Sequence, residues 1–371
     1  MLNKKIKTMR KVFVMMLAAA LALGNLTASG QEKGEQFSIA SLNVDGLPQQ
    51  ILMLKINADG PGDAGTARIG KYLMQKSYDL VMMQEDFNYH GVLSVLLEDD
   101  YKLDSWSGAV GLDVTKVDFL HLQNHRFECD GLMGCWKNDL TVTPMGRTAW
   151  KQSFGKFSHA NDEMVTKGFR RYEVTLRGGS RIVVYNMHMD ASDDEDEAAK
   201  NDAKDKAARM AQWEQLKADV LQQLDTRPIV IVGDMNSLYG RDDIQTMFVD
   251  AINETGRGTV SDVWKELKRQ EEETLDKILY VNPATGTKIQ PIAFSLDRAG
   301  YLHDGKPLGD HYPVAATFQV VSGTITGVEA VSDDRESEQS FYDLNGQRIS
   351  QPRSGVYIER RGGKTDKHIA K

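Results

Sequence analysis

Cysteine is nearly absent from this sequence, which contains only Cys129 and Cys135 among its 371 residues. Two thiols six positions apart, with no histidines at a matching spacing, do not make up the usual ligand set of a zinc site. Disulfides persist in exported proteins, so a short-loop disulfide is compatible with the N-terminal pattern described below. We interpret the pair as structural and leave open whether the two thiols are joined.

An excess of positive charge is also absent. The formal net charge is −8, and it becomes −13 without the five basic residues of the first thirty positions. Proteins that bind nucleic acid over a wide surface usually carry a positive field, because they neutralise phosphates. The composition therefore disfavours such a protein, although a metal ion and a few cationic side chains can hold a phosphate locally.

Long apolar runs are missing as well. The apolar run near the N-terminus, residues 12–23, is shorter than the roughly 20 residues that a membrane-spanning helix needs. It follows five basic residues and precedes the small residues 28–30, which predicts a signal peptide over residues 1–30. No cysteine follows this run, so a lipid anchor is not indicated. We expect a secreted or cell-surface protein with no stable membrane span.

Proline is scarce, with nine residues, while 41% of the residues are apolar, so the chain can bury a substantial core in one large domain. Short apolar or β-branched segments that end in polar residues are typical of buried strands, and here they alternate with segments of helical periodicity. The predicted strands cover residues 37–44, 80–84, 181–187 and 228–233, and the predicted helices cover residues 66–76 and 197–224. This alternation predicts an α/β layered domain.

The composition changes after Phe318. Residues 321–340 are rich in serine, glycine, threonine and acids, which predicts a linker. Residues 341–371 contain Phe341-Tyr-Asp-Leu-Asn-Gly-Gln-Arg-Ile349 and Gly355-Val-Tyr-Ile358, which predict two hairpin-forming strands followed by a basic end. This small β-rich tail resembles the sorting domain of type IX secretion, and an ordinary β-rich extension is the alternative.

Polar residues stand at the C-terminal ends of four predicted strands. One such residue is usually a turn former. Six of them on four strands predict a shared site, because strand ends that converge bring their side chains together. The six residues are Asn43, Asp45, Glu85, His188, Asp234 and Asn236.

Five motifs that carry these residues occur in a characteristic order. They are Ser41-Leu-Asn-Val-Asp-Gly-Leu-Pro48, Gln84-Glu85, Asn186-Met-His-Met-Asp190, Gly233-Asp-Met-Asn236 and Gly309-Asp-His-Tyr-Pro-Val314. The set resembles the endonuclease/exonuclease/phosphatase (DNase I-like) superfamily, which includes pancreatic-type deoxyribonucleases, abasic-site endonucleases, inositol polyphosphate 5-phosphatases and neutral sphingomyelinases. The resemblance covers residues 36–320 and implies a four-layer α/β sandwich, with two mixed β-sheets flanked by helices. It also implies metal-dependent hydrolysis of a phosphoester.

The same resemblance implies a metal shell. Glu85 would supply a carboxylate to the ion, Asn43 and Asp310 would complete the neighbouring positions, and Asp45 would add a further ligand. Oxygen donors of this kind suit Mg2+ better than zinc, and Mn2+ is expected to substitute for it.

Roles in the reaction are implied for four residues of two strands. Asp234 would position a water molecule, and Asn236 would hold a phosphoryl oxygen through its amide. His188 would donate to the phosphoryl oxygens or to the leaving group. Asn186, two residues earlier on the same face of the strand, is a candidate phosphate ligand that would support His188.

His311 is the favoured base or transition-state stabiliser, and the resemblance pairs it with Asp276. An aspartate bonded to a histidine fixes the imidazole tautomer and stabilises its protonated form. Lys277 departs from the family pattern, in which Tyr often follows this Asp, so a loop or helix-start acid is the alternative for Asp276. The histidines at positions 90, 121, 125, 159 and 303 are interpreted as surface or loop residues without a role.

Lys167 stands in a segment, Lys-Gly-Phe preceded by Asp162, that resembles the sphingomyelinase-like branch and implies a phosphate contact by the lysine. A loop entering a strand over residues 171–176 is the alternative. The 5-phosphatase branch would show Trp where Val232 stands, and abasic-site endonucleases would show Ala where Ser237 stands. Export and the acidic charge favour a lipid phosphodiester such as sphingomyelin over nucleic acid. An extracellular endonuclease is the first alternative, and a non-catalytic binding protein of the same fold is the second.

Overall fold

The computed structural model describes residues 34–51, 54–111, 126–156, 159–192, 203–267 and 272–321, together with backbone strands over residues 340–342, 348–349, 355–361 and 364–370. The chain divides into two compact units, Met1–Gly323 and Thr324–Lys371. The predicted signal peptide and almost all of the predicted linker lie outside the described residues. Within the described part, no helix combines the length and the apolarity that crossing a membrane requires.

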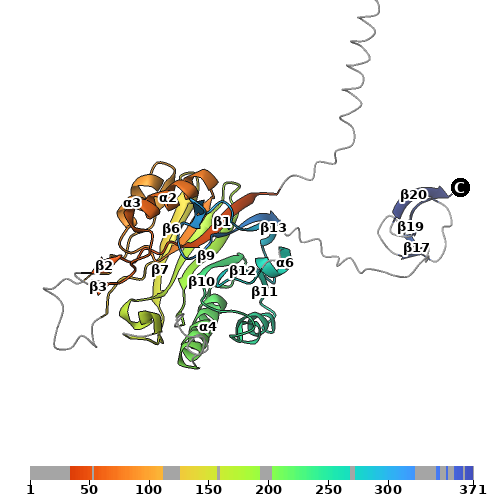
Figure 1. The fold of residues 1–371 in the computed structure, drawn as a ribbon. Coiled ribbons are helices and arrows are strands. Elements are labelled where there is room, and N and C mark those ends of the chain that lie inside the picture. The colour runs from red at the N-terminus through yellow and green to blue at the C-terminus, as the bar shows by residue number, and fades with distance from the viewer. Residues whose placement is uncertain are drawn as a thin grey trace, which may run out of the picture. The chain divides into compact units, whose positions relative to one another are not determined.

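Two six-stranded mixed sheets form the centre of the larger unit (Figure 1). The first has the order β13 (Lys288–Leu296), β16 (Val314–Val321), β1 (Gln36–Asn43), β4 (Leu80–Gln84), β6 (Met133–Lys137) and β5 (Tyr101–Leu103). The second has the order β11 (Gly258–Asp262), β12 (Asp276–Pro283), β10 (Ile229–Asp234), β9 (Arg181–His188), β8 (Gly168–Thr175) and β7 (Thr141–Ala149). In each sheet one pair of central strands is parallel, β1 with β4 and β9 with β10, and the other neighbours are antiparallel.

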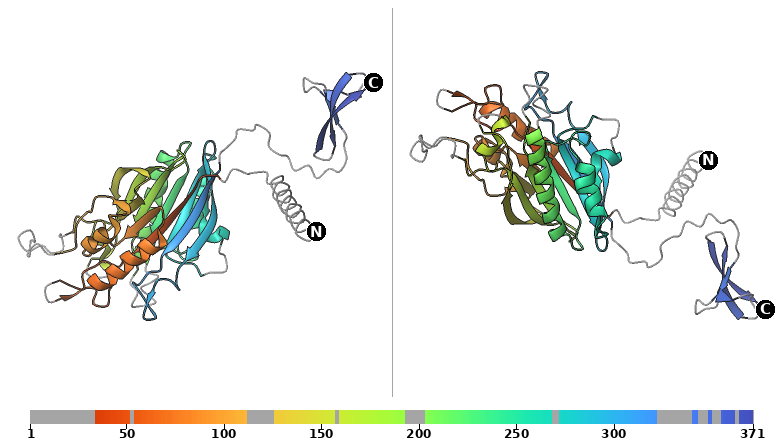
Figure 2. Two further views of the ribbon diagram at one scale, coloured as in Figure 1. Left: turned by 90° about the horizontal axis from the view of Figure 1, so that it is seen from above. Right: turned by 90° about the horizontal axis from the view of Figure 1, so that it is seen from below.

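Helices cover the outer faces of both sheets (Figures 1 and 2). On the first sheet lie α2 (Gly62–Lys76) and α3 (His90–Leu97), whose apolar side chains share a buried cluster with β1 and β4. On the second sheet lie α4 (Ala203–Gln223), the π-helix η4 (Gln245–Asp250) and α5 (Ala251–Asn253), which share a cluster with β9 and β10. The short α6 (Val263–Leu267) follows β11, and η2 (His159–Met164) precedes β8. The predicted four-layer α/β sandwich is confirmed.

The alternation of side chains along the strands explains the layers. Successive residues of a strand point to opposite faces. In β1, Phe37 and Ile39 are buried between the sheets, whereas Leu42 packs toward the helices. Val184 of β9 and Val232 of β10 meet them from the second sheet. Burial of each such side chain contributes about 1.5–3 kcal/mol to stability. Strands with apolar residues on both faces are therefore stabilised by the other sheet on one face and by helices on the other.

The strand register gathers the polar strand ends at one edge of the sandwich. Asn43 is paired with Gln84 across β1 and β4. Asp234 is paired with His188 on one side and with Asp276 on the other. The inner-face positions therefore change from apolar to polar at this edge, which is where the candidate site lies.

The predicted elements agree with the observed ones within a few residues where the structure describes them, with two informative differences; residues 197–202 of the predicted second helix lie outside the described residues. Helix α2 begins at Gly62, four residues before the predicted start. The sequence pattern did not predict these four residues because Gly-Asp-Ala-Gly carries no apolar periodicity. Acidic Asp63 in the first turn suits the helix dipole at that position. Strand β8 begins at Gly168, directly after Lys167, and so takes in three residues that the sequence left in a loop.

Both cysteines are free and buried, so the short-loop disulfide that the sequence left open is not formed. Cys129 packs in a small cluster with Phe87 and Val110. Cys135 lies on β6, in the cluster under α2 and α3. The thiols belong to different parts of the core, which explains their separation.

Small β-elements complete the structure. Two hairpins lie in loops of the larger unit, β2 (Gln50–Ile51) with β3 (Leu54–Lys55) and β14 (Leu302–His303) with β15 (Lys306–Pro307). The smaller unit forms a sheet of order β18 (Arg348–Ile349), β17 (Ser340–Tyr342), β19 (Gly355–Arg361) and β20 (Lys364–Ala370). The sequence predicted the first three strands as two segments but treated the basic end as a tail, whereas it pairs with β19 along its length.

Candidate active site

Three of the predicted site residues have left-handed backbone conformations. Asp45, Glu85 and Asn236 have φ angles of 52°, 57° and 45°, and each follows the end of a strand. This region is unfavourable for residues other than glycine and is enriched at functional sites. The conformational preferences of these residues alone therefore do not explain the turns that follow β1, β4 and β10.

Gly233 shows how closely the strands approach beside the site. Its φ is 151°, and a Cβ atom placed on it would lie 2.0 Å from the carbonyl oxygen of Met187. Only glycine fits there, and the next residue is Asp234. The Gly-Asp-x-Asn motif therefore combines a packing requirement with a chemical one.

Asp234 is the centre of the site, and it is 2% exposed. Its Oδ2 atom lies 3.2 Å from Asn43 Nδ2, 3.4 Å from His188 Nε2 and 3.6 Å from His311 Nε2. Its Oδ1 atom accepts a hydrogen bond from the backbone N–H of Asn236 at 3.0 Å. Residues from both sheets thus converge on one carboxylate.

His311 and Asp276 form a close pair, as the sequence predicted. The distance between His311 Nδ1 and Asp276 Oδ2 is 2.6 Å, and Asp276 is the first residue of β12. Burial alone lowers the pKa of His311, but Asp276 and Asp234 outweigh it, and the pKa lies well above its usual value. Lys277 does not disturb the pair, because its ammonium donates to Glu273 and to the carbonyl oxygen of Thr274.

Three carboxylates, those of Asp45, Glu85 and Asp310, influence one another electrostatically, and Asn43 Nδ2 donates to Glu85 at 2.9 Å. Burial, followed by the charges of Asp310 and Glu85, raises the pKa of Asp45 to about 7, although Asn57 donates to it. Burial, opposed by Lys167 but aided by Asp310, likewise raises the pKa of Glu85. Mutual repulsion of this kind is relieved when a cation binds between the carboxylates, so the oxygen donors fit a hard divalent ion.

A different group of side chains has ligand atoms spaced closely enough to hold an ion. One ligand atom each from Asp234, Asp276 and His311 lies within 4.8 Å of the others. The hydrogen bond between His311 and Asp276 already accounts for one ring nitrogen and one carboxylate oxygen. This group is therefore already partly engaged in a hydrogen bond, which leaves fewer of its atoms for an ion.

Lys167 and His188 lie in contact beneath these groups. Lys167 Nζ is 3.1 Å from His188 Nε2 and forms an ion pair with Asp162, the acid of the predicted motif. Burial alone would lower the pKa of Lys167, but the charges of Asp162 and Glu85 raise it by a larger amount. The pKa therefore lies above its usual value, and the lysine stays charged. Burial, then Lys167 and His311, lower the pKa of His188 well below its usual value, which keeps the imidazole neutral.

Asn186 lies one layer deeper than the other predicted residues. Its Oδ1 accepts from Gln84 Nε2 at 2.7 Å, and its Nδ2 donates to the carbonyl oxygens of Met83 and Met133 at 2.9 and 3.1 Å. The whole amide is therefore engaged in joining the two sheets. The amide of Asn236 donates to the carbonyl oxygen of Met189 at 3.1 Å, which anchors that side chain at the rim.

Several supporting residues were missed by sequence reasoning. Ser41 and Gln84 form a buried polar layer with Asn186, and their place on the inner faces follows from the same two-residue period as Asn43. No sequence pattern marked Asn57 or Trp150 as part of the site. The Trp150 indole N–H donates to the carbonyl oxygen of His188 at 2.7 Å and fixes the end of β9.

Two histidines that the sequence assigned to the surface or to loops have defined partners. His90 opens α3, lies 2.6 Å from Asp86 and stacks on Trp106. His159 lies 3.0 Å from the buried Asp205. His303 is exposed in β14, and the histidines at 121 and 125 lie outside the described residues.

No family model matches the chain. Sphingomyelinases of Mycobacterium bovis and Mycobacterium tuberculosis are 23% identical to it over 310 residues, which cover 78% of this chain and 54% of those proteins. The chain thus spans about half the length of these curated relatives.

Solved structures show the same fold. D. rerio TDP2 in complex with a single-strand DNA product matches 76% of this chain and 99% of its own, with a TM-score of 0.53 and 16% identity. SmcL matches the same shares with a TM-score of 0.51 and 17% identity. Together with the two packed mixed sheets, these likenesses show that the chain shares the fold of these solved structures, which is the fold that the ordered motifs predicted.

Proposed function

We propose that this domain is a divalent-metal-dependent phosphodiesterase. The observation that carries the proposal is the convergence on Asp234, where Asn43, His188 and the His311–Asp276 pair meet beside a group of carboxylates. Hydrolysis of a phosphodiester needs a positioned water, a cation or hydrogen-bond donors for the phosphoryl oxygens, and a stabilised leaving oxygen. The residues at this edge of the sandwich would supply each of these functions.

The protonation states of the site residues indicate which part of the reaction each residue would serve. Asp234 is the residue that would orient and deprotonate the attacking water, because it is the only carboxylate within 3.6 Å of both His188 and His311 among the described residues. His311, held charged by Asp276, would stabilise negative charge on the phosphoryl group. Neutral His188 and charged Lys167 would contact the remaining oxygens.

Glu85, Asp45 and Asp310, with the side-chain oxygen of Asn43, are the residues that would hold the metal. A bound Mg2+ or Mn2+ would neutralise charge on the phosphoryl and leaving oxygens. Asp310 is exposed and the Glu85 side chain is 19% exposed, so these carboxylates are open to a substrate.

The substrate that we favour is a phosphocholine lipid of the sphingomyelin type. Three observations support it: the relatives named sphingomyelinase, the ion pair of Asp162 with Lys167, and the net charge of −8. A nucleic-acid strand is the second candidate, supported by the fold shared with TDP2 bound to single-strand DNA. We further propose export through residues 1–30, which detection of the mature protein outside the cells would test.

The experiment compares two substrates under one Mg2+ condition. Purified protein is incubated with sphingomyelin dispersed in detergent and, separately, with supercoiled plasmid. We expect release of phosphocholine and little nicking, since zwitterionic lipids impose no repulsion on an acidic protein while polyanionic DNA does.

Asp234→Ala and His311→Ala serve as controls, and each is expected to remove activity on either substrate. Efficient nicking with intact sphingomyelin would replace the lipid proposal with the nuclease. Inertness toward both, combined with no binding of Mg2+, would favour a non-catalytic binding protein instead.

A further inference from the structure

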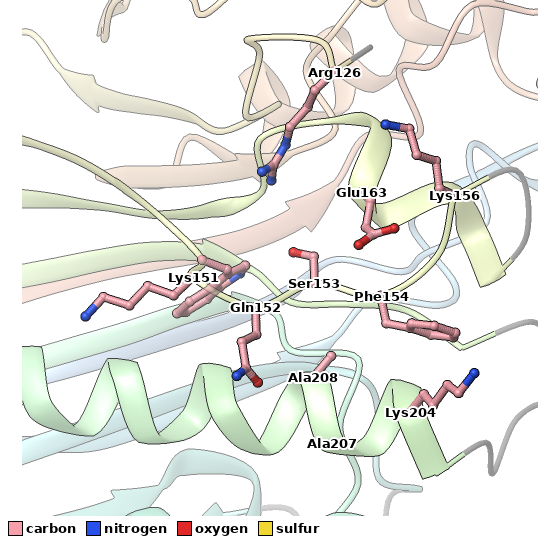
Figure 3. Close-up of a pocket in the computed structure, with 11 residues that line it drawn as sticks. Arg126, Lys151, Gln152, Ser153, Phe154, Lys156, Glu163, Lys204, Ala207 and Ala208 are labelled. Atoms are coloured by element: carbon pink, nitrogen blue, oxygen red, sulfur yellow. The ribbon is translucent and has the colours of Figure 1, made fainter. Parts of the chain in front are cut away.

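A pocket of about 590 Å³ lies beside the candidate active site and contains none of the predicted site residues. Figure 3 shows Arg126, Lys156 and Glu163 on one side of it and Lys204 of α4 on the opposite side. The volume lies within the range of about 300–1,000 Å³ that holds small organic ligands. The remaining lining residues are Trp150, Lys151, Gln152, Ser153, Phe154, Ala207 and Ala208.

The lining is strongly cationic in a chain whose net charge is −8. Among the described lining residues, the basic ones are Arg126, Lys151, Lys156 and Lys204, and the acidic one is Glu163. Among the residues that the structure describes, neither Lys151 nor Lys156 forms an ion pair, and Arg126 donates only its Nε to the carbonyl oxygen of Val165. Like charges held together repel one another, so an anion in the pocket would stabilise them.

The pocket wall also offers a hydrogen-bonding group that lacks a partner. The Oγ atom of Ser153 is buried and has no hydrogen-bond partner among the described residues. Figure 3 shows its hydroxyl pointing into the space between the two sides of the pocket. Buried hydroxyl groups normally have partners, and a ligand oxygen at this position would supply one.

The pocket is attached directly to the candidate active site. Trp150, which lines it, donates its indole N–H to the carbonyl oxygen of His188 at 2.7 Å. The backbone N–H of Trp150 donates to the carbonyl oxygen of Lys167 at 3.0 Å. Phe154 donates its backbone N–H to Asp190, two residues beyond His188. A group bound in the pocket therefore lies against the segments that carry the reacting side chains.

We propose that this pocket is a second anion-binding site that holds a phosphate group other than the one that reacts. Arg126 and Lys156 supply the charge, and Ser153 supplies a hydroxyl. The phosphate can belong to the substrate, as an additional group, or be free phosphate. The role in substrate choice rests on the proposed phosphodiesterase, whereas the binding itself does not.

Binding is measured by titration calorimetry of the full chain with inorganic phosphate, in excess chelator and at constant ionic strength. The chelator removes any metal, so that phosphate does not bind through the carboxylates of Glu85 and Asp310. Loss of one charged hydrogen bond costs about 1.5–3 kcal/mol, which is roughly tenfold or more in affinity. We therefore expect Arg126→Ala and Lys156→Ala each to weaken phosphate binding by about tenfold.

Two further variants distinguish phosphate binding in the pocket from nonspecific electrostatic attraction of phosphate to surface lysines. Ser153→Ala leaves the charge unchanged and is expected to weaken binding several-fold, while Lys288→Ala removes an exposed lysine of β13 and is expected to have no effect. Absence of phosphate binding to the wild type would overturn the proposal. An equal loss in Lys288→Ala and Lys156→Ala would also overturn it.

A kinetic comparison identifies the source of the phosphate. The substrates are a thymidine dinucleotide with and without a 5′-phosphate. If the pocket holds a substrate phosphate, Lys156→Ala raises KM for the phosphorylated dinucleotide alone. If it holds free phosphate, neither KM changes and inorganic phosphate alters the rate of the wild type but not that of the variant. Phosphate binding without hydrolysis of either dinucleotide or of sphingomyelin would remove the phosphodiesterase proposal and leave the pocket assignment in place.

Discussion

Replacement of Asn186 by leucine separates a structural role from a chemical one. The sequence makes Asn186 a candidate phosphate ligand, whereas its amide makes three hydrogen bonds between the two sheets. Leucine is similar in size but forms none of these bonds. It leaves the carbonyl oxygens of Met83 and Met133 without this donor in a fully buried layer.

The size of the effect follows from those contacts. Three lost hydrogen bonds at about 1 kcal/mol each give about 3 kcal/mol, and buried groups left without partners add to it, for a total of about 3–5 kcal/mol. At about 2–4 °C of melting temperature for each kcal/mol in a large domain, the expected shift is about 6–20 °C.

The assay is thermal unfolding followed by circular dichroism, together with urea denaturation. Asn282→Leu is a matched control, because Asn282 also makes two side-chain bonds, to Ile289, but is partly exposed and can be replaced there by water. We expect a much smaller shift for the control. An unchanged melting temperature for Asn186→Leu, with a large rise in KM, would refute the structural role and support phosphate binding.

The remaining predictions concern the metal shell, the close approach of Gly233 to strand β9, and the thiols. Glu85→Gln should weaken Mg2+ binding, measured by titration calorimetry, more than His311→Ala does, since only the former removes a metal ligand; equal Mg2+ affinities in the two variants would argue against the assignment. Gly233→Ala should lower the free energy of unfolding by about 3 kcal/mol or more, because its new Cβ atom would lie 2.0 Å from a backbone oxygen, and a stability equal to wild type in urea would contradict this. Ellman's reagent should react slowly with native protein and rapidly with both Cys129 and Cys135 in denaturant, whereas no reaction after unfolding would indicate a disulfide.

Much of the fold could be predicted because its central strands carry clear local signals. Strands β4 and β10 are continuous apolar runs followed by acids, and a buried strand of this kind needs little context to be recognised. The converging site residues follow from the same signals, since polar residues at strand ends meet where the strands do. The two-sheet architecture came from the ordered motifs rather than from periodicity.

Other features depend on tertiary contacts that no local pattern encodes. Asn57 donates to Asp45, but nothing in its sequence neighbourhood marks it as a partner of the site. The short β20 has charged residues along its length and becomes a strand only by pairing with β19. The cationic pocket draws Arg126, Lys156 and Lys204 from distant segments, so the sequence shows only three unrelated basic residues.

The most direct test of the account is the hydrolysis of bis(p-nitrophenyl) phosphate by the wild type and by Asp234→Asn, each with Mg2+ and with excess chelator. This diester has no headgroup, so the result does not depend on which natural substrate is correct. We expect wild-type hydrolysis that stops in chelator and returns with Mg2+, and a rate in Asp234→Asn that is lower by about 10²–10⁴-fold, as for loss of a general base. Hydrolysis that persists in chelator, or an Asp234→Asn variant as active as the wild type, would contradict a metal-dependent site centred on Asp234.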